Sequence, residues 1–144
     1  MTTHTLTRTG LPPLRFTGRL LAEASSAQEH GSRRHRYHVI RLYEVEQDSR
    51  AEGPARRVVQ IEYRSVPSRT NSRHEHGYDQ AEAVEASAVP EYLADYDPAE
   101  DVTGGYPPIE RFAVQQVRMV SEVVDGFDAA VSAVLAAAGY VETI

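Results

Sequence analysis

Two different hydrophobic periods divide this chain of 144 residues, and they limit the folds open to it. Between residues 14 and 65, apolar residues tend to recur at every second position, which is typical of strands with one buried face. From residue 113 to residue 138 they recur at alternating spacings of four and three, which places them on one stripe of a helix. Because the strands come first and the long helix last, the order predicts an α+β fold.

Three segments carry the strand pattern. Residues 34–46 have apolar groups on both faces, as a central strand would. Within residues 57–65, three apolar residues alternate with polar ones, namely Val59, Ile61 and Tyr63. These segments predict an antiparallel meander of three strands, with a fourth, edge strand at residues 73–78 as the alternative to a loop. Residues 14–24 place five apolar side chains on one face: Leu14, Phe16, Leu20, Ala22 and Ala24.

The helices are predicted from their end signals. Asp79 suits the N-cap of a short helix over residues 80–87, and residues 91–96 suit one helical turn. A long amphipathic helix is predicted from Pro107-Pro108 to Ala138, packed on the sheet and ended by Gly139. Residues 1–13 are predicted to be a flexible leader, and residues 14–144 a single α+β domain.

The stripe of the long helix has two interpretations. It is either the core face of the helix or a seam that meets a second copy of the chain. The second interpretation predicts a homodimer, with these residues as the candidate interface: Val120, Val124, Phe127, Val131 and Val134.

Charge is divided unevenly along the chain. All fifteen cationic side chains are arginine. Residues 1–76 hold thirteen arginines beside eight acidic residues, a net charge of about +5, whereas residues 77–144 hold two arginines beside thirteen acidic residues, about −11. This asymmetry predicts either a charged partner or two halves that pack against each other.

Several classes of protein are excluded or disfavoured. The chain has no cysteine, so it has no disulfide and no zinc–thiolate site. No apolar run approaches the roughly 20 residues of a membrane span, and the polar N-terminus does not resemble a signal peptide. The expected location is therefore cytoplasmic, without membrane contact. A Gly-rich phosphate loop and a G-x-S-x-G elbow are both absent from the sequence.

One face of the predicted sheet carries arginines and tyrosines. Guanidinium groups pair with phosphates and tyrosine rings stack on unpaired bases, so this face predicts binding of single-stranded nucleic acid as an alternative function. The opposing interpretation is that the arginines pair with carboxylates of the same chain. The candidate binding surface consists of Arg15, Arg19, Tyr37, Arg41, Tyr43 and Arg64.

One polar segment contains the residues best suited to catalysis. Arg69, Arg73, His74 and His76 resemble the residue types of a metal-independent phosphodiesterase, in which histidine moves a proton and arginine stabilises phosphate charge. Two histidines two residues apart on a strand share one side, but a catalytic zinc needs three protein ligands. Neither a metal nor another cofactor is therefore predicted. The sequence favours a small cytoplasmic, non-catalytic binding or regulatory protein that acts through protein contacts or self-association.

Overall fold

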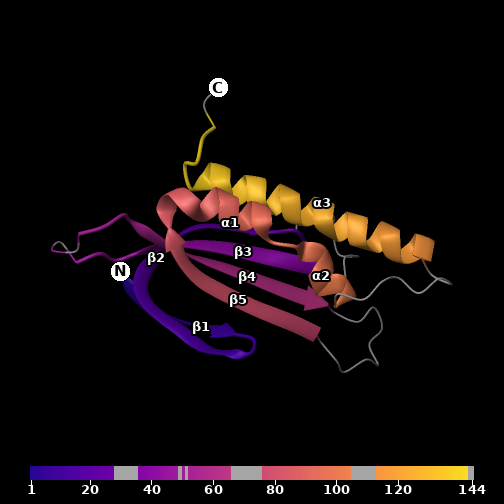
Figure 1. Ribbon diagram of the computed structural model, residues 1–144, viewed down its shortest axis with the longest axis horizontal. Helices are drawn as coiled ribbons and strands as arrows, with labels where there is room; N and C mark the ends of the chain where they lie inside the picture. Colours follow the sequence, from indigo (N-terminus) through magenta and orange to yellow (C-terminus); the bar gives the residue numbers. More distant parts are fainter. Residues whose placement is uncertain (28–35, 49, 51, 66–75, 105–112, 143–144) are drawn as a thin grey trace.

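A five-stranded antiparallel sheet forms the body of the computed structural model, which describes residues 1–27, 36–48, 50, 52–65, 76–104 and 113–142. The strands follow one another across the sheet in the order β1-β2-β3-β4-β5. Helices cover one face of the sheet, with α3 lying along it (Figure 1). The predicted α+β fold is confirmed, with one or two more strands than expected. The strands are β1 (Thr2–Arg8), β2 (Leu11–Ser25), β3 (Arg36–Val45), β4 (Arg56–Ser65) and β5 (His76–Glu85). The helical elements are η1 (Ala86–Ala88), α1 (Val89–Asp95), α2 (Pro98–Thr103) and α3 (Ala113–Ala137).

The N-terminal residues belong to the sheet, which corrects the expectation of a flexible leader. β1 pairs with β2, with Leu6 opposite Leu14, and Gly10 adopts a left-handed conformation (φ 77°) in the turn between them. Threonines alternate along β1, and threonine favours strands because its branched side chain fits a pleated surface. Leu6 anchors the strand by packing into an apolar cluster with Tyr43, Val58 and Ala81.

A β-bulge changes the face on which β2 presents its apolar residues. Leu20 lies opposite Tyr43 and Ala22 lies opposite Leu42, so one extra residue is inserted between them. An extra residue reverses the alternation of faces. Consequently Phe16 packs on the same side as Tyr43, whereas Ala22 packs beneath the helices. The single apolar face predicted for residues 14–24 is therefore split between the two sides of the sheet.

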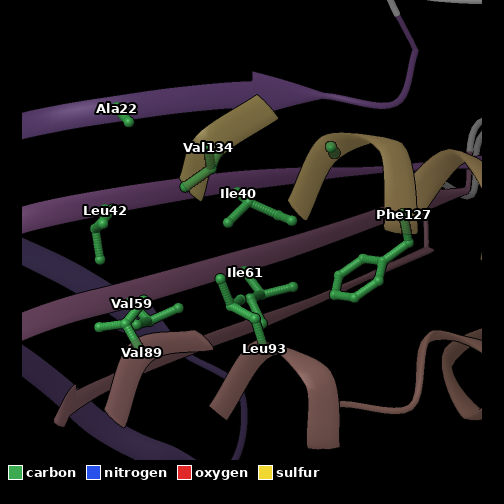
Figure 2. Packing of buried hydrophobic residues seen from close by; sticks show 10 residues of the cluster. Ala22, Ile40, Leu42, Val59, Ile61, Val89, Leu93, Phe127 and Val134 are labelled. Carbon is green, nitrogen blue, oxygen red and sulfur yellow. The ribbon is translucent and has the colours of Figure 1, made fainter. Parts of the chain in front are cut away.

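The main core lies between the sheet and the helices. Figure 2 shows that α1 and α3 both direct apolar side chains onto the sheet. The register places Ile40 opposite Ile61 and Leu42 opposite Val59, so β3 and β4 form the floor of this core, as predicted for a central strand and its neighbour. The buried cluster consists of Ala22, Ile40, Leu42, Val59, Ile61, Val89, Leu93, Phe127, Ala130 and Val134.

The sheet curls until its two edge strands approach each other. The backbone N–H of Thr9, next to the end of β1, donates to the carbonyl of Asp79 in β5 at 2.8 Å. The N–H of Asp79 donates in return to Oγ1 of Thr9, also at 2.8 Å. These two bonds fix the turn between β1 and β2 beside β5, and they form one side of the groove described below.

β5 replaces the short helix predicted over residues 80–87. It pairs with β4 without interruption from His76 opposite Ser65 to Glu85 opposite Arg56. Its alanine-rich and glutamate-rich sequence suits a helix, but the continuous ladder with β4 overrides that weak local preference. The one-turn helix predicted for residues 91–96 corresponds to α1.

α2 was not predicted, although both of its ends carry standard signals. The side chain of Asp97 caps it by accepting from the N–H of Ala99 at 3.0 Å, and Gly104 ends it with φ 64°. α3 runs through Gly126 without a break and is followed by Gly139 with φ 86°, while its predicted start at Pro107-Pro108 lies outside the described residues. Within the described ranges, none of the helices combines the length and the apolar character needed to cross a membrane.

Candidate functional site: an acidic groove lined by tyrosines

A groove of about 880 Å³ lies beside β5, bordered by α1, α2 and the turn between β1 and β2. Among the described residues that line it, six are acidic and one, Arg8, is basic, so this lining is strongly acidic. Three tyrosines, Tyr78, Tyr92 and Tyr96, also line the groove. The acidic residues are Asp79, Glu82, Asp95, Asp97, Glu100 and Asp101, of which Asp79 directs its carboxylate to Arg64 on the other face of the sheet.

Local structure explains why these side chains face one space. In β5, residues two apart point to the same side, so Tyr78 and Glu82 share the face that carries the helices. Tyr92 and Tyr96 are four residues apart on and just after α1, which places them on one side of that helix. The buried Pro98 begins α2, and this short helix brings Asp101 back toward the sheet.

Asp101 is held by a buried network. His38 is completely buried on β3, and its Nε2 lies 2.8 Å from Oδ2 of Asp101. The hydroxyl of Tyr96 donates to the same oxygen at 2.6 Å. The other oxygen, Oδ1, has no hydrogen-bond partner among the described residues. Asp101 therefore has a fixed position in the groove wall, and one of its oxygens is without a hydrogen bond to any described residue.

Two tyrosines of the groove, Tyr92 and Tyr96, are held in their neutral form. Burial raises the pKa of Tyr92 to about 12, against a smaller lowering by the hydrogen bond from Gln80. Burial also raises the pKa of Tyr96, and the adjacent carboxylate of Asp101 raises it further, because a phenolate beside a carboxylate is disfavoured. These rings therefore supply apolar faces and hydroxyl groups, and the negative charge of the groove comes from its carboxylates.

The arginines predicted to bind nucleic acid are mostly paired within the sheet. Arg19 pairs with Glu44 at 2.6 Å. Arg41 bridges Glu23 at 2.5 Å and Glu62 at 2.7 Å. These partners all come from the N-terminal half of the chain, so much of the basic charge there is neutralised locally.

The remaining members of that surface are also engaged. Arg64 pairs with Asp79 at 2.7 Å, which is the one contact of this set that reaches the acidic C-terminal half in the described residues. Nε of Arg15 donates to Oγ1 of Thr5 at 3.4 Å. Tyr43 is buried and Tyr37 is half-buried. The structure thus brings Arg41 and Arg64 together in a ladder of alternating charge, and no specific observation favours phosphate binding there.

The five residues of the candidate interface on α3 differ in how deeply they are buried. Phe127 and Val134 are buried in the main core, so neither is accessible to a second copy, and this part of the prediction is corrected. Val120, Val124 and Val131 are half-buried. The exposed apolar residues of α3 lie instead near its start, where Val114 is 70% and Val117 58% exposed.

The polar segment predicted to carry chemistry lies mostly outside the described residues. Arg69, Arg73 and His74 fall in residues 66–75, and only the backbone of His76, at the start of β5, is described. Among the residues that are described, no three histidine or acidic side chains converge on a position suited to a metal ion.

The groove itself was missed by reasoning from the sequence. Its main signal is the concentration of tyrosine and acidic residues in 91–106, which was visible, but nothing in the spacing shows that β5 lies beside that segment. No family model, curated protein or solved structure matches this chain.

Proposed function

We propose that this chain is a cytoplasmic, non-catalytic binding protein that holds a basic segment of a partner protein in the acidic groove. The observation that supports this most is the charge of the groove, whose described lining holds six acidic residues and one arginine. Like charges that share a cavity repel one another, and a cationic ligand relieves this repulsion. The volume of about 880 Å³ is at the upper end of the range for binding clefts.

Three of the acidic side chains are particularly suited to contact a basic segment. Glu82, Asp95 and Glu100 are exposed, and none of them forms an ion pair within the described part of the chain. The other three are engaged: Asp79 with Arg64, Asp97 with the start of α2, and Asp101 with His38. The groove therefore combines fixed carboxylates in its wall with accessible ones at its rim.

The experiment compares two variants with the same change in net charge. E82Q/D95N/E100Q removes the rim charges of the groove, whereas E46Q/D48N/E52Q removes three exposed charges near the turn between β3 and β4. Binding of a labelled basic peptide is followed by fluorescence anisotropy. The groove variant is expected to bind about tenfold more weakly than the native protein, and the control to bind like it.

Added salt provides a second readout. Affinity for the basic peptide should fall as the salt concentration rises, because contacts between exposed charges are screened. An equal loss of affinity in both variants would show that only overall charge matters. No binding of basic peptides at low salt would overturn the proposal itself.

Self-association is a second proposal, and it has its own supporting observation. Val114 and Val117 expose apolar surface near the start of α3, on a helix whose later residues pack in the core. A second copy that covers these side chains would remove apolar surface from water. The predicted outcome of a charge substitution at this position is given in the Discussion.

A further inference from the structure

Three aromatic rings form a column that crosses the sheet toward the groove. His38, Tyr63 and Tyr78 occupy paired positions on β3, β4 and β5. The rings of His38 and Tyr63 are stacked, with centroids 5.0 Å apart and planes inclined by 22°. The rings of Tyr63 and Tyr78 follow with centroids 6.0 Å apart and an angle of 17°. The column therefore begins in the core and ends at the edge of the sheet.

The last ring of this column is open on one side. His38 is fully buried and Tyr63 is 3% exposed, but Tyr78 is 47% exposed and lines the groove. β5 is the edge strand, and Tyr63 covers the face of Tyr78 that points toward β4. The exposed part of Tyr78 therefore faces away from β4, toward the groove and the turn between β1 and β2, where Thr9 is hydrogen-bonded to Asp79. Among the described residues, no further aromatic ring stacks on Tyr78 on that side.

The composition of the groove indicates which kind of ligand group could stack on Tyr78. A stacked layer must be planar, and a group surrounded by carboxylates is favoured if it is cationic and donates hydrogen bonds. Guanidinium meets all three conditions, because it is flat, always charged at neutral pH, carries five N–H donors and stacks on aromatic faces. The ammonium group of lysine has the same charge, but it is not planar and it is more strongly hydrated than guanidinium.

We infer that the groove recognises an arginine side chain of the partner segment, with its guanidinium stacked on Tyr78 and its N–H groups directed to the carboxylates of the groove. This inference rests on the proposed function and names the group that is bound. The site would therefore prefer arginine to lysine, which charge alone would not achieve.

The test uses two peptides that differ only in their cations. One carries arginines in a neutral glycine–serine sequence, and the other carries lysines at the same positions. Binding to the native protein is measured by titration calorimetry at fixed salt. The arginine peptide is expected to bind about two- to fivefold more tightly, the size of a cation–π contact at an exposed site. Equal affinity for both peptides would overturn the inference and leave the proposed function intact. Absence of binding to both would overturn the proposed function as well.

Variants of Tyr78 supply the matched control. Y78F keeps the aromatic face and should keep the preference for arginine, whereas Y78L removes the ring and should bind both peptides equally. Because Y78L also removes a contact with Tyr63, its folding is checked by circular dichroism. In the native protein, a nuclear Overhauser effect between guanidinium protons and the Tyr78 ring tests the contact without any substitution. Its absence in a saturated complex would overturn the stacking.

A blocked arginine amide tests whether the guanidinium group comes from a protein segment or from a small molecule. Blocked arginine amide is expected to bind far more weakly than the peptide, because it engages one position of a groove that is lined by several carboxylates. Affinity equal to that of the peptide would keep the stacking site on Tyr78 but overturn the assignment to a protein segment.

Discussion

Nε2 of His38 and Oδ2 of Asp101 lie 2.8 Å apart, although 63 residues separate them in the chain. The contact joins the central strand of the sheet to α2, the helix that forms part of the groove wall. Because an ionised carboxylate only accepts hydrogen bonds, we assign the ring hydrogen to Nε2. Nδ1 is buried and has no hydrogen-bond partner among the described residues. His38 therefore acts as a fixed donor that positions Asp101.

The first prediction concerns the stability supplied by this contact. D101A removes the acceptor shared by His38 and Tyr96, and it leaves one buried and one half-buried donor without this partner. The free energy of unfolding should fall by about 2 kcal/mol, measured by urea denaturation. E100A, next to it on the same helix but exposed, should change this free energy by less than about 0.5 kcal/mol. Similar losses in the two variants would show that the network contributes nothing specific.

The second prediction concerns the close approach of β2 and β3. Gly18 lies opposite Val45, and a Cβ atom built on it would overlap the carbonyl oxygen of Glu44. Because that oxygen belongs to the backbone, it cannot move aside without distorting the strand. G18A should therefore lower the free energy of unfolding by about 2–3 kcal/mol. An unchanged denaturation midpoint would show that the two strands separate easily at this position.

The third prediction concerns alkaline pH. The pKa of Tyr92 is raised by burial to about 12 from an ordinary value of 10.0. Between these values the unfolded chain has lost the proton and the folded protein has kept it, so the free energy of unfolding falls as pH rises. Below about pH 10 this contribution is fully present. Denaturation measured on both sides of pH 10 should show a steeper fall for the native protein than for Y92F, and parallel slopes would contradict the assignment.

The fourth prediction concerns the two sides of α3. V134D buries an unpaired charge in the core and should unfold the protein, with a loss of more than about 3 kcal/mol. V117D places the same charge on an exposed position and should leave the protein folded. If the start of α3 mediates self-association, V117D should halve the mass measured by light scattering. A native protein that is monomeric at high concentration would remove the self-association proposal.

The parts of the fold that follow from local pattern were predictable. Val59, Ile61 and Tyr63 alternate with polar residues in β4, and the spacing of valines and alanines in α3 defines one face. The register of β2 was not predictable, because the extra residue before Ala22 leaves no mark in the composition. β5 was mistaken for a helix because its pairing with β4, which decides its structure, is a contact between distant parts of the chain.

The groove was beyond prediction for a related reason. It combines the turn after β1, the edge of β5 and the helices α1 and α2, which meet only in the folded molecule. The pairing of the sheet arginines was anticipated as one of two interpretations. What could not be predicted is that most of their partners come from neighbouring strands rather than from the acidic half. Alternation shows which side a residue faces, but not the order of the strands.

The bonds between Thr9 and Asp79 also bear on the order in which the protein folds. These residues are 70 positions apart, whereas each pair of neighbouring strands is connected through a much shorter loop. Closing a long loop costs more conformational entropy than closing a short one, and it is repaid only when the distant contact forms. We therefore expect hairpins to form early and the curl of the sheet to close late. The groove beside β5, which needs that closure, would then be among the last features of the molecule to appear.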